Sequence, residues 1–458
     1  MKVALISPRG AMRNQQNSIL NTIYSRLRDI MSFIEVDDIE FMPNLGLLVI
    51  AAYLDPDDEV HYLEEDYVDP ERSQEIVFDR SYDLVCLSGC NNQAKRAYQI
   101  ADRFREMGVT VVMGGLHASS LPEEALEHVD SVMIGEGEDT FPAFLKDFKN
   151  GSFKKQYISS GNTDLTKVPM PRFDIVEDIT RFNKITVQAT RGCPRNCSYC
   201  STKEVYGKRF RTKTPEQVAR EIEMIKKLYP NPFISFADEN LLADPKYARE
   251  LVSMMIDQKV RWECYCDVAV YKDTELLDML RESNCVELLI GFETVIPESL
   301  KKVSPWKAAM LDKYREAVET IQGHGVPLMG LFMVGFDSDG PDVFERIYEF
   351  IEETNMFDVD FAILCPIPGT QLYDELKKEG RITSEDWDRY TWYHVNYKPM
   401  KISPKELRDG IMWIFNKFNT PERIRKRKEF FNSVLRKLYG DEKVIRDKLE
   451  MMDLAQVM

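Results

Sequence analysis

The stretch RGCPRNCSYC, residues 191–200, holds three cysteines (Cys193, Cys197 and Cys200) in the spacing C-x3-C-x2-C. It follows the apolar run 184–188, which predicts a strand, so the three thiols should share one loop. Three thiolates on a short loop can hold three irons of a cubane iron–sulfur cluster and leave the fourth iron open to a small chelating molecule. A structural zinc site, which takes four ligands, and three unrelated core cysteines are the alternatives.

The composition places the chain among globular proteins. It has 458 residues, 44% of them apolar, and a formal net charge of −16, which argues against bulk binding of nucleic acid. At roughly 100–200 residues per domain we expect two to four domains. The longest apolar run, 45–54, is too short for a transmembrane segment, which needs about 18–20 residues. Nine sparse cysteines do not form a disulfide scaffold, so we expect a cytoplasmic protein.

Residues 1–150 alternate between strand-like and helix-like segments, which predicts a doubly wound, Rossmann-like domain with a parallel sheet. The clearest expected strands are 3–6, 83–88, 109–113 and 131–134, and residues 45–54 are an expected helix. Glycines follow the strand ends at Gly89, Gly114, Gly115, Gly135 and Gly137. Ligands bind at that edge of open α/β sheets, although tight turns alone would also explain these glycines.

The rest of the chain divides into three parts. Residues 151–183 are polar and turn-rich and are expected to be a linker. Residues 184–385 predict a partial β/α barrel, with functional groups at the strand C-termini. Its expected strands are 184–188, 233–236, 262–266, 287–290, 327–334 and 361–364. Residues 386–458 are an expected helical extension, whose basic run 423–428 either touches a membrane or anionic substrate or is a solvated helix face.

With Tyr199 just before its last cysteine, the triad resembles the loop of radical S-adenosylmethionine (SAM) enzymes. The later strand ends ADEN at 237–240, GFE at 291–293 and Gly335 extend the resemblance. It implies that Cys193, Cys197 and Cys200 hold a 4Fe-4S cluster whose open iron binds SAM. It further implies that Tyr199 and Gly335 lie beside the adenine, Glu239 near the amine and Glu293 near the ribose.

The front domain resembles the cobalamin-binding domain that is fused to many such enzymes. The resemblance is carried by PNLGLL at 43–48, Ser88-Gly89, GGLHA at 114–118 and GEGE at 135–138. It implies that cobalamin is contacted by Ser88, Gly114, Gly115, His117, Gly135, Glu136 and Gly137. The loop SPRGAM at 7–12 lacks the histidine that ligates cobalt in many cobalamin proteins. His117 is therefore expected to be a contact to the cobalamin tail, or else a surface histidine.

Four C-terminal motifs resemble the branch that contains hopanoid and bacteriochlorophyll C-methylases. They are YGKRFRTK at 206–213, PIPGTQLY at 366–373, EGRI at 379–382 and HVNY at 394–397. The resemblance implies a methyltransferase in which a 5′-deoxyadenosyl radical from SAM activates an unreactive carbon and methylcobalamin supplies the methyl group. The implied partners are a lipid-like or tetrapyrrole-like small molecule (a peptide is not excluded) and a one-electron donor such as ferredoxin or flavodoxin.

Two other functions stay open from the sequence. A cobalamin-dependent cyclase or oxidative enzyme of the porphyrin type would use the same cofactors. The chain could also be a non-catalytic iron–sulfur or cofactor-binding protein; an electron carrier of this kind would need a fully ligated cluster. The remaining cysteines considered, Cys86, Cys90, Cys264, Cys266 and Cys285, are expected to be buried and apolar rather than part of a second cluster. Trp306, Trp387 and Trp392 either line a substrate cavity or, as is usual for bulky aromatic residues, belong to the core, which is the expectation here.

Overall fold

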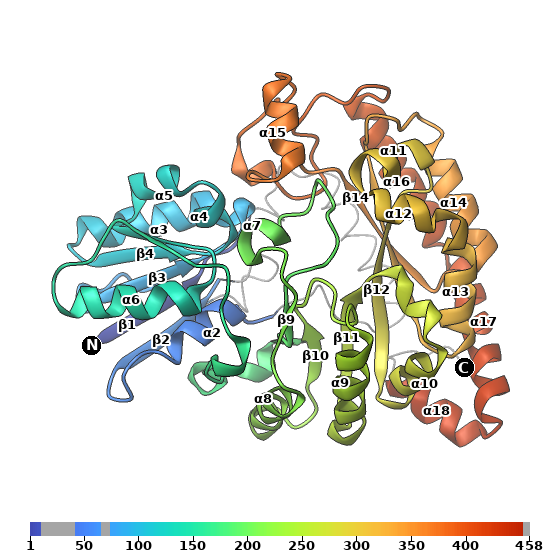
Figure 1. Ribbon diagram of the computed structural model, residues 1–458, viewed down its shortest axis with the longest axis horizontal. Coiled ribbons are helices and arrows are strands. Elements are labelled where there is room, and N and C mark those ends of the chain that lie inside the picture. The colour runs from blue at the N-terminus through green and yellow to red at the C-terminus, as the bar shows by residue number, and fades with distance from the viewer. Residues whose placement is uncertain (11–41, 66–73, 452–458) are drawn as a thin grey trace.

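The computed structural model describes residues 1–10, 42–65 and 74–451, which form two α/β units and a helical C-terminal region (Figure 1). Each unit is built on a six-stranded sheet whose strands all run parallel. In Figure 1 the N-terminal sheet lies at the left, the second sheet at the right, and helix α7 (Thr202–Tyr206) between them. The α/β class expected from the alternating pattern is confirmed.

The N-terminal sheet has the strand order β2-β1-β3-β4-β5-β6. Its strands are β1 (Lys2–Ser7), β2 (Glu59–Glu64), β3 (Leu84–Ser88), β4 (Thr110–Gly114), β5 (Ser131–Ile134) and β6 (Gln156–Ile158). Its helices are α2 (Leu45–Ala51), α3 (Ala94–Glu106), α4 (Leu116–Ser120), α5 (Pro122–His128) and α6 (Gly137–Lys149). Helices α2 and α6 pack in one apolar cluster and α3 and α5 in another, so both faces of the sheet are covered. The strand order reverses at β1 and β3, which is where such sheets bind ligands.

Two strands of this sheet were not expected, and both lie at its edges. Strand β2, EVHYLE, is largely polar, and β6 has only three residues. Edge strands are covered less completely than central ones, so their sequences lack a continuous apolar run. Strand β6 falls within the expected linker 151–183, where Phe173 and Phe182 are also fully buried. That segment is therefore more ordered than its polar composition indicates.

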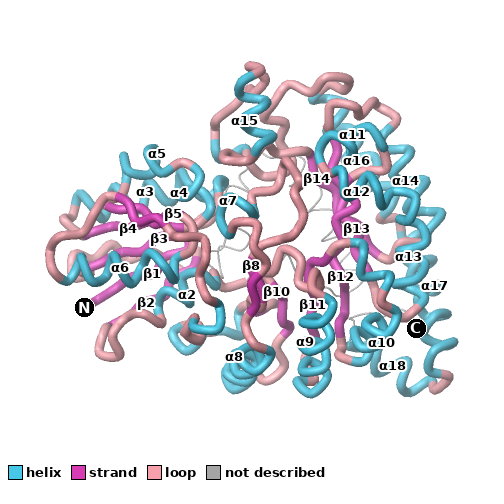
Figure 2. Tube along the Cα trace, in the orientation of Figure 1, coloured by secondary structure: helices cyan, strands magenta, loops and turns pink. Residues whose placement is uncertain are grey.

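The second sheet has the order β7-β10-β11-β12-β13-β14, with β7 and β14 at its edges. Its strands are β7 (Ile185–Val187), β10 (Phe233–Phe236), β11 (Arg261–Cys266), β12 (Cys285–Glu293), β13 (Leu328–Val334) and β14 (Asp358–Ile363). The helices between them include α8 (Pro215–Leu228), α9 (Pro245–Gln258), α10 (Thr274–Glu282), α11 (Pro297–Val303), α12 (Pro305–Met310), α13 (Tyr314–Gly323) and α14 (Val343–Thr354). Figure 2 shows α9, α10, α13 and α14 along the outside of the strands. The expected partial β/α barrel is confirmed.

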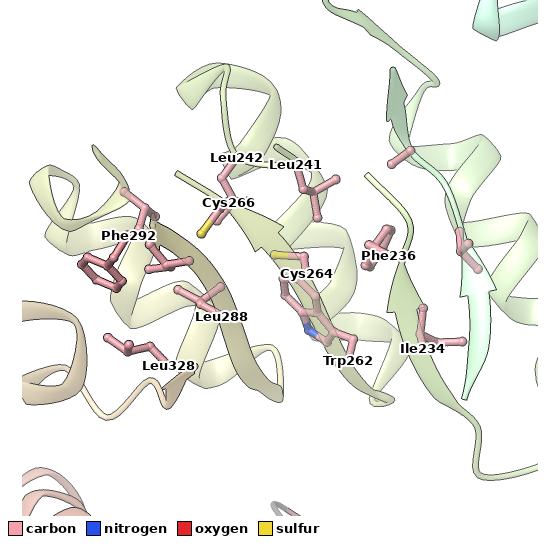
Figure 3. Close-up of a cluster of buried hydrophobic side chains, with 14 of the residues drawn as sticks. Ile234, Phe236, Leu241, Leu242, Trp262, Cys264, Cys266, Leu288, Phe292 and Leu328 are labelled. Carbon is pink, nitrogen blue, oxygen red and sulfur yellow. The ribbon is translucent and has the colours of Figure 1, made fainter. Parts of the chain in front are cut away.

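Side chains of the middle strands form an apolar cluster (Figure 3). Cys264 and Cys266 from β11 lie there close to Trp262 of the same strand, and Cys285 is 1% exposed. Burial raises the pKa of the Cys264 and Cys285 thiols well above their ordinary value, so they are protonated at neutral pH. The prediction of buried apolar cysteines is correct for these three and for Cys86 but wrong for Cys90, which is exposed at a turn.

The C-terminal region becomes continuously helical later than expected. Residues 384–403 are largely irregular, and only then do α16 (Pro404–Phe418), α17 (Pro421–Tyr439) and α18 (Glu442–Met451) follow. In the basic run on α17, Arg423 and Lys426 pair with Glu352 of α14, so part of the run is docked rather than solvated. No helix among the described residues combines the length and apolar character needed to cross a bilayer.

The tryptophans differ in their surroundings. Trp387 is 6% exposed and packs in the core as expected. Trp306 is half-buried and lies against Arg195 at the mouth of the barrel. Trp392 is 41% exposed, so it is not a core residue.

Candidate active site at the mouth of the barrel

The three cysteines lie on a loop whose base is closed by a short hairpin. Strands β8 (Thr190–Arg191) and β9 (Arg211–Thr212) pair antiparallel, and all three cysteines fall between them. Because β8 comes directly after β7, the loop stands at the C-terminal end of a barrel strand, where β/α barrels place their functional groups. Gly192 begins the loop with a φ of +83°, and an added Cβ would overlap the Arg209 carbonyl group. Only glycine fits there.

Each cysteine sulfur has a polar side chain beside it. The amide nitrogen Nδ2 of Asn240 is 3.8 Å from Cys193 Sγ. Ser304 Oγ lies 3.2 Å from Cys197 Sγ, and Thr202 Oγ1 lies 3.1 Å from Cys200 Sγ. A thiolate can only accept hydrogen bonds, so all three groups would become donors once the cysteines lose their protons to a metal. Three half-buried thiols with donors beside them fit an iron–sulfur cluster.

Glu239 follows β10 next to this loop. Burial raises the pKa of its carboxyl group to about 8. Its Oε2 atom is buried and has no hydrogen-bond partner among the described residues. A buried acceptor without a partner is unfavourable by itself, and an ammonium group would satisfy it. The site therefore offers a carboxyl group, which a neighbouring ammonium would hold ionised, where the resemblance implies the amine of SAM.

Glu293 ends β12 in a strained conformation. Its φ is +64°, and the register between β12 and β13 shifts between Gly291 and Glu293. The carboxylate forms a buried ion pair with Lys307 of α12, and any side chain at Gly291 would collide with that pair. Strain of this kind in a non-glycine residue is typical of functional sites.

Tyr199 and Gly335 complete this wall of the mouth. The Tyr199 ring lies 6.2 Å from the ring of Phe336, and burial raises the pKa of its hydroxyl well above the ordinary value. Gly335 has a φ of +103°, donates its N–H to Asp339 at 2.9 Å and accepts a hydrogen bond from the Tyr397 hydroxyl. The structure thus gathers Tyr199, Glu239, Glu293 and Gly335 around the strand ends.

Sequence reasoning missed Asn240, Ser304 and Lys307 as individual site residues. Asn240 belongs to the motif at 237–240, so its position could have been inferred from the end of β10. Ser304 and Lys307 lie about a turn apart around the start of α12 and carry no recognisable motif. Their roles depend on how α12 folds back over the cysteine loop.

Several of the expected cobalamin contacts lie at the C-terminal edge of the N-terminal sheet. Ser88 and Gly114 end neighbouring strands and pair in register. Gly115 has a φ of +91°, and an added Cβ would lie 2.9 Å from the Gly89 carbonyl oxygen. Gly135 has a φ of +84°, and a Cβ added there would lie similarly close to the Ser159 side chain. A Cβ added at Gly137 would lie close to the Ile50 side chain. Close packing within the protein therefore favours glycine at these three positions of the edge.

His117 is neither a surface residue nor an open ligand. It is fully buried, with Nδ1 3.0 Å from Asn91 Nδ2 and Nε2 2.7 Å from the Tyr98 hydroxyl. Its ring also packs against Trp387 at 5.4 Å. Both ring nitrogens are therefore engaged within the protein, and the surface interpretation is wrong. The motif located the loop but not the direction of the side chain.

Glu136 also points away from the expected ligand. Its carboxylate is 1% exposed and accepts hydrogen bonds from Arg191 and Arg211 at the base of the cysteine loop. Both arginines were missed as functional residues. The available signal was charge: two buried arginines beside a loop require acidic partners, and GEGE supplies them.

Fold and site together define a class of protein. A doubly wound domain of the cobalamin-binding type presents its ligand-binding edge to a partial β/α barrel, and the barrel carries a three-cysteine loop with carboxylates at the next strand ends. This is the organisation of a cobalamin-containing radical SAM enzyme.

Comparison with known proteins leads to the same class. Residues 40–145 match the B12 binding domain and residues 187–351 the radical SAM superfamily. The chain is 30% identical to bacteriochlorophyllide d C-12(1)-methyltransferase of Chlorobaculum tepidum over 80% of each chain. It is 27% identical to hopanoid C-2 methylase of Rhodopseudomonas palustris, over 75% of this chain and 67% of that protein. The cobalamin-dependent SAM radical enzyme OxsB has the same fold, with a TM-score of 0.69 at 17% identity over 100% of this chain and 76% of OxsB.

The chain belongs to the family of cobalamin-dependent radical SAM methyltransferases. The family and its cofactors (a 4Fe-4S cluster, SAM and cobalamin) are as the sequence predicted. Because the relatives are methyltransferases, the comparisons do not support the non-catalytic alternative.

Proposed function

We propose that this protein methylates an unactivated carbon of a large, mostly apolar small molecule with a tetrapyrrole-like or lipid-like skeleton. The supporting observation is the 30% identity over 80% of both chains with an enzyme named for methylating bacteriochlorophyllide d. The similarity to a hopanoid methylase extends the candidate class to lipid skeletons.

The residues of this chain have distinct tasks in that reaction. Cys193, Cys197 and Cys200 would hold the cluster, which supplies one electron to the sulfonium of SAM when bound. The carboxylate of Glu239 would receive the amine of SAM through a charge-assisted hydrogen bond. Glu293, held by Lys307, would fix the ribose. The wall that contains Tyr199 and Gly335 would enclose the adenine and exclude water.

The electron would come from a small carrier such as ferredoxin or flavodoxin. A hollow of about 640 Å³ lies beside the cysteine loop and includes Arg195 and Asp267 in its lining. Asp267 binds Asn240 at 2.8 Å, and Asn240 in turn contacts Cys193 Sγ. The chain of contacts from Asp267 through Asn240 to Cys193 supports electron entry through Cys193. All nine cysteines are free, which supports a reducing cytoplasm.

The test is anaerobic reconstitution with iron, sulfide and hydroxocobalamin, followed by incubation with methyl-labelled SAM and extracted tetrapyrroles and lipids. We expect one labelled methyl group in the product and 5′-deoxyadenosine beside it. Cys197→Ala is expected to abolish deoxyadenosine formation, and retained cleavage would contradict the role of the loop. A product that lost hydrogen or gained oxygen without label would instead favour the cyclase-type alternative.

A further inference from the structure

Four charged side chains join the two α/β units: Glu136 and Glu138 from the N-terminal unit, and Arg191 and Arg211 from the barrel. We call them the Glu–Arg network. Arg191 Nη1 lies 3.1 Å from Glu136 Oε1 and 2.9 Å from Glu138 Oε2. Arg211 Nη1 lies 2.7 Å from Glu136 Oε2. The network contains two positive and two negative charges, so it is balanced.

The network is buried and its remaining donors are occupied. The exposed fractions of the four side chains lie between 0% and 8%. Arg191 Nε donates to Gln188 at 2.7 Å, and Arg211 also donates to the carbonyl oxygens of Thr163 and Tyr206. Buried ion networks add little net stability, and they are best understood where they fix one arrangement of the parts they join.

Both ends of the network lie on the loops that matter for the cofactors. Glu136 is the N-cap residue of α6 and Glu138 lies in its first turn, so both belong to the motif after β5 that resembles a cobalamin-binding loop. Arg191 is two residues before Cys193, and Arg211 lies opposite it in the hairpin that closes the cysteine loop. The network thus connects the loop that resembles a cobalamin-binding loop directly to the cysteine loop.

We propose that the Glu–Arg network sets the position of the cobalamin loop relative to the cysteine loop and so aligns SAM with cobalamin for methyl transfer. This inference rests on the proposed function. Transfer between two bound groups requires near-contact of the reacting atoms, and a displacement of about 1 Å can cost roughly 100-fold in rate. Reductive cleavage of SAM uses only groups of the barrel. A weakened network should therefore uncouple the two reactions.

The test variant is Glu138→Gln, which removes one charge from the network and leaves the Glu136 contacts in place. The reconstituted protein receives methyl-labelled SAM, hydroxocobalamin and titanium(III) citrate as reductant. Reduced cobalt supplies the electron pair, the methyl group leaves the SAM sulfur for cobalt, and S-adenosylhomocysteine is released. We expect label in cobalamin to form about 10- to 100-fold more slowly while 5′-deoxyadenosine formation stays within about two-fold. Glu138→Asp should restore part of the transfer.

The matched control is Lys95→Met. It breaks the Lys95–Asp386 ion pair, which also joins the N-terminal unit to the C-terminal part of the chain but is solvent-exposed. We expect both products to form at the wild-type rate in this variant. If Glu138→Gln does not fold, the double variant Glu138→Gln/Arg191→Met removes a whole pair and leaves Glu136 with Arg211.

Hydrogen exchange of the cofactor-free full chain gives a second readout. Glu138→Gln should accelerate amide exchange in peptides covering 131–140 and 188–212, and Lys95→Met should not. Equal loss of methyl transfer and deoxyadenosine, or no change in either, would overturn the proposal. Should the wild type form neither product, the proposed function fails and the exchange result alone decides the role of the network.

Discussion

At the scale of single residues, Glu239 has the most informative chemistry. Its pKa of about 8 lies above the ordinary 4.5, so the folded state holds a proton between these values that the unfolded state releases. Its contribution to stability is full below about pH 4.5 and is lost as the pH rises through about 8. We expect Glu239→Gln to flatten the pH dependence of the free energy of unfolding of the cofactor-free protein between pH 5 and pH 8.

Urea unfolding at a series of pH values measures this effect. Glu319→Gln, at an exposed position on α13, is the control and should leave the profile unchanged. An identical profile for wild type and Glu239→Gln would mean that this carboxyl group titrates normally.

Asn240 should tune the cluster, because hydrogen bonds to cysteine sulfur stabilise the more negative, reduced state. We expect Asn240→Leu to lower the midpoint potential by about 50 mV, which corresponds to ~1 kcal/mol for a one-electron couple. A redox titration followed by electron paramagnetic resonance measures it. Thr202→Ser keeps a hydroxyl near Cys200 and should leave the potential unchanged. An unaltered potential in Asn240→Leu would show that the 3.8 Å contact does not act on the cluster.

At the scale of elements, the cysteine loop depends on two glycines with positive φ. Gly207 has a φ of +71° and no neighbour closer than 3.9 Å to an added Cβ. Gly207→Ala should therefore lower the free energy of unfolding by about 1–2 kcal/mol through backbone strain alone. Gly192 has a φ of +83°, and an added Cβ would also overlap the Arg209 carbonyl group. Gly192→Ala should therefore lower the free energy of unfolding by more than Gly207→Ala does, and it should reduce iron incorporation. Urea midpoints and iron content test this pair. Equal effects of the two substitutions would contradict the close approach at Gly192.

The elements that the sequence predicted best are those buried on both faces. Strand β10 has the expected bounds, because FISF is a short apolar run between turn residues. Strand β2 was not predicted, because its edge position tolerates the largely polar sequence EVHYLE. Residues 386–403 were expected to be mainly helical, but Trp387 packs there against His117 of the other unit. Such tertiary contacts override the local pattern.

At the scale of the whole molecule, motifs led to the loops of the proposed site but not to the direction in which their side chains point. The cysteine spacing is local, so a single loop determines it. Glu136 and His117 lie on the expected loops, yet their side chains bind Arg191 and Trp387, which are distant in sequence. Lys307 reaches Glu293 only because α12 folds back over the mouth. Contacts between distant segments therefore hold the information that one sequence lacks.

Electron paramagnetic resonance of the oxygen-free, dithionite-reduced protein, recorded before and after addition of SAM labelled with ¹⁵N in its amine, tests the account most directly. A 4Fe-4S signal that changes with SAM and shows coupling to the labelled nitrogen is the predicted result. A signal indifferent to SAM, or a metal analysis that finds zinc in place of iron, would contradict the claim that these three cysteines leave one iron free for SAM.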